Sequence, residues 1–412
     1  MAVSWNNEYD PNQLAQKIEQ SRVIDEKGGI GYTGFETFEY IALLFSMLNF
    51  SNGIPEIEGR RIVQQAVYSA GKRAHITAMN ILAEINRLEG EFLRTPLIRY
   101  ILVTSLSVSK MVLLPKIYIN NAYITFGGQL SKVCQRERDR IIANRAQNIL
   151  YTAAPTDYLT TRIYVSARSP YEAIDLALNA MNLIRGIWNW FYNRQHSIRM
   201  SLGSQAPVNK IVQGPVHTLH LPNGNLAIET FWYEPRFYSP QRVYNPTPEI
   251  DKLCKFTSNV RKRLTKCKYH QVIEDSIIQY ARALDERDWE AAFLRLWSIL
   301  ERLTNTSDFY KDIIKRASFI FEDREYYKQV LKHLKDFRNK YVHEAGDSSE
   351  METYMYELKN IVESLLGFHL GNKFNFNSIS EVAEFLDLSS DRDALASRVK
   401  LINYAQKFLH YV

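Results

Sequence analysis

The sequence predicts an α+β N-terminal domain over residues 1–245, followed by an all-α helical bundle over residues 249–412. Before the boundary, runs rich in Val, Ile, Tyr and Thr alternate with helical patterns, which is typical of mixed structure. After it, nearly every stretch repeats apolar residues at helical spacing. A loop rich in Pro and Tyr, residues 235–248, separates the mixed pattern from the helical one, and the domain boundary is predicted there.

Composition and length agree with a folded chain of two domains. The 412 residues are 46% hydrophobic and 23% charged, which is too apolar for a disordered protein. The three cysteines form no CxxC pair, so no disulfide framework or zinc site is indicated and a reducing cytoplasm is expected. The net charge of +6 permits a nucleic-acid partner without requiring one.

The opening residues lack the basic and then apolar pattern of a secretory signal. The most apolar runs are residues 40–48 and 101–114. The first is too short to span a bilayer and Lys110 interrupts the second, so both are interpreted as core and no membrane partner is expected.

In the first 150 residues, helical periodicity comes before and after a strand-rich stretch. Helices are predicted over residues 11–26 and 38–50, and one long helix or two shorter ones over residues 60–93. Strands are predicted within residues 101–126, and a helix over residues 131–151.

The segment from residue 157 combines a strand, a capped helix and a hairpin. Residues 158–167 alternate like a strand, and Ser169-Pro170-Tyr171-Glu172 has the residue types of a helix start. Residues 217–233 are predicted to form a hairpin that turns at 222–225. His217 and His220 would face opposite sides of its first strand, which argues against a joint metal site.

The C-terminal half is predicted to be helical throughout. Asp288 and Ser378 have the positions of N-caps. The predicted helices cover residues 251–263, 271–284, 289–303, 325–342 and 351–370, with a last helical unit after Ser378.

One motif in this half carries candidate chemistry. Residues 337–344 contain Arg338, Asn339 directly after it, and His343 five positions after the arginine, at the end of an apolar helix. This resembles the R-x(4–6)-H signature of HEPN domains, in which a polar residue follows the arginine. The helix over residues 288–301 is similar to the corresponding helix of the Apea-like branch. Arg263 and His270 have a similar spacing but lack the polar follower and the helix-end position.

The resemblance implies an endoribonuclease that needs no metal and no cofactor. When the 2′-OH of RNA attacks the adjacent phosphate, a histidine suits the proton transfers near neutral pH. An arginine holds the extra negative charge on the phosphorus centre with fixed donors. On a continuous helix, Asn339 and His343 lie about 40° apart, and Arg338 and His343 about 140° apart. Arg338 would therefore approach from the side, or the helix would loosen before His343.

Several supporting residues have two interpretations each. Glu301 either pairs with Arg338 to orient it or faces solvent. Lys340 and Tyr341 either contact RNA or are ordinary surface residues. The densest basic run includes Arg261, Lys262 and Arg263, which either hold a phosphate backbone near the site or form a solvated face.

The family resemblance also implies a biological setting. Family members serve as toxins or antiviral defence effectors and usually build the site across a two-fold interface, so RNA and a second copy of the chain (a homodimer or higher homo-oligomer) are the expected partners. The N-terminal domain would then bind a trigger or inhibitor that restrains the nuclease. The rival interpretation is a catalytically silent HEPN-like module that only binds RNA or a protein.

Overall fold

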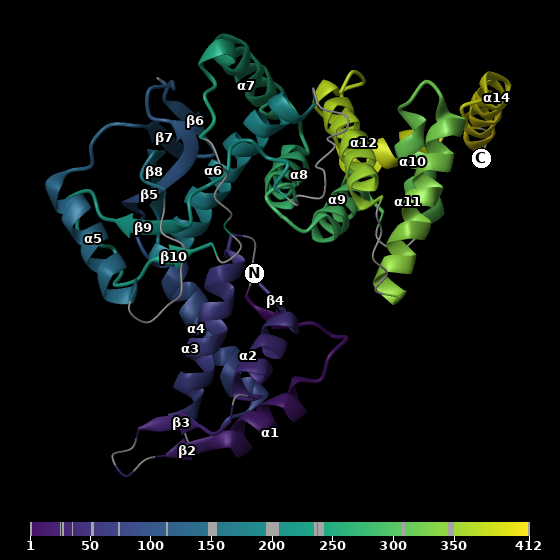
Figure 1. Cartoon of the computed structure of the whole chain (residues 1–412). Helices are drawn as coiled ribbons and strands as arrows, with labels where there is room; N and C mark the ends of the chain where they lie inside the picture. The colour runs from purple at the N-terminus through teal and green to yellow at the C-terminus, as the bar shows by residue number, and fades with distance from the viewer. Residues whose placement is uncertain are drawn as a thin grey trace.

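The computed structural model confirms an α+β N-terminal region followed by an all-helical C-terminal region (Figure 1). It describes the chain except for residues 1, 25, 27–28, 35, 51–52, 73–74, 113, 147–154, 195–205, 235–236, 238–242, 307–309, 345–349 and 411–412, and except for the side chains of residues 145–146, 310 and 341–344. Most of the buried apolar residues described belong to three clusters: an N-terminal helical unit, a sheet with its covering helix, and the C-terminal helices.

The N-terminal helical unit (residues 2–95) is the first of these. Its helices are α1 (Pro11–Ser21), α2 (Glu36–Ser46), α3 (Glu56–Gly71) and α4 (Ala78–Arg94), with the short pairs β1 (Ser4–Trp5) with β4 (Leu48–Asn49) and β2 (Arg22–Ile24) with β3 (Ile30–Tyr32). The stretch 60–93 is therefore two helices. The helix predicted to reach residue 26 ends at Ser21, because the β-branched Val23 and Ile24 enter a strand pair instead.

A six-stranded sheet follows, in the order β10-β9-β5-β8-β7-β6 and antiparallel throughout. Its strands are β5 (Ile98–Ser109), β6 (Ile117–Ile119), β7 (Ala122–Phe126), β8 (Tyr158–Ala167), β9 (Val216–His220) and β10 (Trp232–Tyr233). Alternation gives the sheet two different faces. A row of Leu102, Ile163, Ile124 and Ile117 crosses the strands on one face and is buried.

That apolar face is covered by α6 (Pro170–Asn193), which begins as the sequence predicts: the Ser169 side chain accepts a hydrogen bond from the Glu172 backbone N–H at 3.0 Å. The opposite face is partly covered by α5 (Lys132–Ala146). Arg138 of α5 donates to the backbone carbonyls of Val103 (3.1 Å) and Val216 (3.0 Å). At β5 and β9 the sheet therefore has α6 on one face and α5 on the other.

The C-terminal region contains a 3₁₀ turn (Thr247–Glu249) and eight helices in the described residues. They are α7 (Ile250–Leu264), α8 (His270–Ala283), α9 (Trp289–Leu303), α10 (Tyr310–Phe319), α11 (Arg324–Glu344), α12 (Met351–Gly371), α13 (Ile379–Leu386) and α14 (Arg392–Leu409). The predicted caps are confirmed, since Asp288 accepts from the Glu290 N–H and Ser378 from the Glu381 N–H. The helix α14 buries none of its residues.

The long helix α6 belongs to two cores at once. Ile184 and Met181 pack with the sheet, whereas Leu183, Ile187 and Trp190 pack with α8 and the other C-terminal helices. Figure 1 shows α6 between the sheet and α8. The predicted boundary near residue 245 marks a change in secondary structure, but the apolar packing continues across it through α6.

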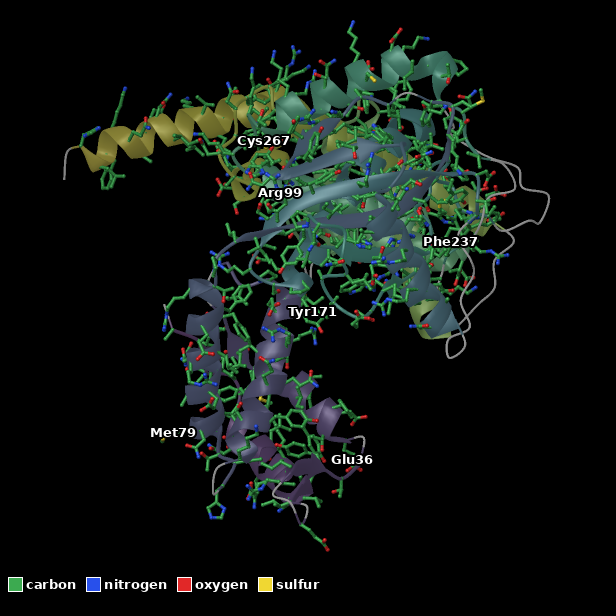
Figure 2. All side chains as sticks on the ribbon, turned by 90° about the vertical axis from the view of Figure 1, so that its left-hand side faces the viewer. Glu36, Met79, Arg99, Tyr171, Phe237 and Cys267 are labelled. Carbon is green, nitrogen blue, oxygen red and sulfur yellow. The ribbon has the colours of Figure 1, made fainter. Side chains whose placement is uncertain are left out.

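The N-terminal helical unit joins the rest of the molecule at the start of α6. The buried Glu58 of α3 accepts a hydrogen bond from the Ser169 hydroxyl, and Arg61 lies 5.9 Å from the ring centre of Tyr171. Figure 2 shows this unit hanging below the sheet, with Glu36 and Met79 far from Tyr171.

Candidate functional site

The predicted catalytic motif lies at the C-terminal end of α11. The helix runs without interruption to Glu344, so its backbone does not loosen before His343. Asn339 and His343 therefore start from the same side of the helix, about 40° apart, and Arg338 starts about 140° from His343. The backbone therefore does not have the loosened arrangement considered from the sequence, and the approach of Arg338 from the side stays a prediction.

Phe337, the residue directly before Arg338, anchors this end of α11. Phe337 lies with its ring centre 5.4 Å from that of Phe293 in α9 and 4.8 Å from that of Tyr354 in α12. His333, one turn earlier, contacts the same tyrosine at 4.9 Å. These ring contacts hold the arginine of the motif at a defined position beside α9 and α12.

Arg338 and Asn339 are both half-buried. One guanidinium nitrogen of Arg338 donates to the amide oxygen of Asn339 at 3.4 Å. Lys340 is exposed, in keeping with either of its two interpretations. The side chains of Tyr341 and His343 lie outside the part of the chain that the structure describes, so their predicted roles stay predictions.

Glu301 lies near the end of α9, where its carboxylate accepts a hydrogen bond from the indole N–H of the buried Trp297 at 2.9 Å. This contact fixes the carboxylate against the helix instead of leaving it to extend freely. The predicted pairing with Arg338 stays a prediction.

The three basic residues on α7 take different positions. The Arg261 guanidinium donates to the backbone carbonyl of Tyr118. Arg261 and Lys262 both line a cleft between α7 and the sheet. Arg263 is exposed. Figure 1 shows α8, α9 and α12 between α7 and α11, so the structure does not bring these residues together with the α11 motif.

That cleft has a volume of about 1030 Å³ and lies between the β6–β7 turn, the ends of β5 and β8, and the facing parts of α7 and α8. Three tyrosines, two asparagines and three cations contribute to its walls. The lining residues are Arg99, Tyr118, Ile119, Asn120, Asn121, Ala122, Tyr123, Tyr164, Val165, Ser166, Ser258, Arg261, Lys262, Leu264, Thr265 and Glu274.

Arg261 and Lys262 could be predicted from the sequence, whereas the tyrosines opposite them were not predicted. Tyr118, Tyr123 and Tyr164 belong to three strands and meet only because of the strand register. The signal in the sequence was the Tyr-rich alternation of residues 117–126 and 158–167. Alternation alone does not give the register that places them in one row.

The two histidines of β9 have separate surroundings. His217 is hydrogen-bonded through Nδ1 to Thr104 Oγ1 (2.8 Å) and through Nε2 to Glu234 (3.3 Å), and burial lowers its pKa. His220 contacts the Gly224 carbonyl oxygen (2.9 Å) and the Thr218 hydroxyl (2.9 Å). Both rings are thus engaged in contacts that hold the sheet and its β9–β10 connection.

In the described residues, no three or more His, Cys, Asp or Glu side chains gather as metal ligands would. Within the same residues, no helix combines the length and the apolar character needed to cross a bilayer.

No known family model, curated protein or solved structure matches this chain. The resemblance to HEPN domains therefore depends on the motif residues of α11 and on the residues of α9.

Proposed function

We propose that this chain is a metal-independent endoribonuclease of HEPN type, with Arg338, Asn339 and His343 as its catalytic residues. The observation that carries the proposal is the motif on α11, where an unbroken helix puts Asn339 and His343 on one side. The ring contacts of Phe337 with Phe293 and Tyr354 fix the position of that helix end.

In the proposed reaction the 2′-oxygen of a ribose forms a bond to the adjacent phosphorus, and the bond from phosphorus to the 5′-oxygen breaks. The proton lost by the 2′-OH ends on the leaving 5′-oxygen, so the products are a 2′,3′-cyclic phosphate and a 5′-hydroxyl. His343 moves protons, for which an imidazole suits neutral pH. Arg338 stabilises the additional negative charge on the phosphorus centre, and Asn339 orients the imidazole or a phosphate oxygen.

The biological setting is part of the proposal. An RNase of this kind acts in the cytoplasm as a toxin or antiviral defence effector and assembles as a homodimer that brings two α11 motifs face to face. The N-terminal domain binds the trigger or inhibitor that controls it. The cellular role, the homodimer and the control by the N-terminal domain are all implied by the family resemblance of the α11 motif.

The test uses the wild type with the His343→Ala and Arg338→Ala variants, each checked for folding by circular dichroism. Total RNA and a tRNA pool are incubated with each protein in excess EDTA. We expect cleavage by the wild type alone, with cyclic-phosphate ends and intact DNA. Loss of one residue of a cooperating pair should lower the rate by a factor on the order of 10² or more.

A matched control is Lys311→Gln, an exposed substitution on α10, which should cut RNA at the wild-type rate. Variants at 338 and 343 that cut as fast as the wild type would refute the site. RNA that the full chain binds but leaves intact, with the same binding in His343→Ala, would favour the catalytically silent binding module.

A further inference from the structure

The cleft between the sheet and α7 combines stacked aromatic rings with cations. Tyr118, Tyr123 and Tyr164 are cross-strand partners on β6, β7 and β8, so their side chains lie on one face of the sheet. The rings of Tyr118 and Tyr123 stack with centres 4.6 Å apart and planes 28° apart, and Tyr164 continues the row at 5.5 Å. The three rings form a short aromatic ladder.

The ladder ends at an accessible ring. Tyr118 belongs to β6, the edge strand of the sheet, and is 66% exposed although one face stacks on Tyr123. A large aromatic side chain this exposed gains little from burial in the folded chain itself. Its outer face is in the position where one more flat aromatic group would extend the stack.

Cations surround the same cleft. Arg261 and Lys262 approach from α7, and Arg99 is exposed at the start of β5 (Figure 2). The one carboxylate in the lining, Glu274, is already engaged by Asn120 (2.5 Å) and His270 (3.2 Å). The cleft therefore presents a positive rim to a ligand, which favours an anion.

The walls of the cleft are held in place before any ligand arrives. Asn120 and Asn121 both have positive φ (46° and 60°), so they form the tight two-residue turn of the β6–β7 hairpin. The Asn120 side chain is bonded to Glu274 of α8, and the Tyr118 carbonyl oxygen accepts from Arg261 of α7. Two helices thus fix the hairpin that carries the outer tyrosine.

We propose that this cleft binds a nucleotide, with its base stacked on the outer face of Tyr118 and its phosphate against Lys262, Arg261 and Arg99. Aromatic platforms with adjacent cations are the usual means of holding single-stranded nucleic acid and free nucleotides, because every base offers a flat π-face and every phosphate a negative charge. The nucleotide is either a residue of an RNA strand or a free nucleoside phosphate. This inference rests on the cleft alone and does not need the ribonuclease proposal.

The experiment measures binding to the full chain by calorimetry in EDTA. The probes are ATP, adenosine, inorganic tripolyphosphate and a fully 2′-O-methylated RNA octamer, which cannot be cut by 2′-OH attack. The variants are Tyr118→Leu and Lys262→Gln. The matched controls, an exposed tyrosine and an exposed lysine away from the cleft, are Tyr326→Leu on α11 and Lys311→Gln on α10.

We expect Tyr118→Leu to weaken binding of the base-containing ligand about tenfold, as loss of one stacked ring does. Lys262→Gln should weaken binding and lower the slope of log Kd against log salt by up to about one. The controls should bind as the wild type does. Binding of ATP identifies a free nucleotide as the ligand, and binding of the octamer alone identifies an RNA strand; both outcomes support the proposal.

Three results would overturn it. The first is wild-type protein that binds neither ATP nor the octamer at millimolar concentration. The second is tripolyphosphate that binds as tightly as ATP, which would remove the role of the base. The third is affinity that does not change in Tyr118→Leu and Lys262→Gln, which would place the ligand elsewhere.

Discussion

His369 is a buried histidine whose charge state ties the stability of the helical region to pH. It lies on α12 with 0% of its surface exposed, its Nε2 is bonded to the Leu303 carbonyl oxygen at 2.9 Å, and its Nδ1 lies 3.4 Å from the Tyr269 hydroxyl. Burial lowers its pKa from 6.5 to about 4. The folded protein therefore holds this ring neutral over a range in which the unfolded chain would protonate it.

The direction of the pH effect follows from this. The unfolded chain binds the proton near pH 6.5 and the folded chain only near pH 4, so stability present above pH 6.5 is lost as the pH falls between these values. The loss amounts to about 3 kcal/mol at the low end. Urea unfolding of the wild type from pH 7 to 4 should show a steeper decline than that of His369→Gln, which keeps a donor for Leu303. Parallel curves for the two proteins would contradict the assignment.

At the scale of elements, α6 and α8 come into close contact at Gly186. A Cβ at Gly186 of α6 would lie 2.6 Å from the backbone carbonyl oxygen of Ile277 on α8, and backbone atoms cannot move aside as a side-chain end can. Gly186→Ala should therefore push the helices apart and lower the free energy of unfolding by about 1–3 kcal/mol.

Gly367 on α12 is the matched control, since a Cβ there meets nothing within 4 Å. Gly367→Ala should raise the free energy of unfolding by up to about 1 kcal/mol, because alanine leaves the unfolded chain fewer backbone conformations than glycine does. Both effects are measured by chemical denaturation of the full chain. An equal effect of the two substitutions would mean that the α6–α8 contact is not as close as the geometry indicates.

The sequence predicted elements well where local signals are strong and poorly where partners are distant. Three helix starts could be predicted from residues that cap the following N–H groups: Ser169, Asp288 and Ser378. All three caps are present in the structure. The pair β2–β3 and the tyrosine ladder depend on strand pairing, which local patterns do not contain. The candidate motif on α11 was visible because its residues are neighbours in the chain, whereas the cleft joins residues from 99 to 274.

For the whole molecule, the sharing of α6 by two cores decides which parts of the chain can fold alone. A fragment of residues 249–412 would lose Leu183, Ile187 and Trp190 from its core. It would also lose the carbonyl oxygen of Asn193, to which the fully buried ammonium of Lys359 donates at 3.0 Å. Exposing that apolar surface and removing an acceptor from a buried charge are both costly.

The N-terminal helical unit is different, because the buried apolar residues of its cluster all lie within residues 3–92. Among the polar contacts between this unit and the remainder of the chain is the hydrogen bond from the Ser169 hydroxyl, at the start of α6, to Glu58. The chain without residues 1–95 should therefore keep one cooperative thermal transition, while residues 249–412 alone should unfold over a broad range and be digested quickly by protease. Calorimetry and limited proteolysis of the two fragments decide this. A sharp transition in the shorter fragment would show that the helical bundle does not need α6, and would place a true domain boundary near residue 245.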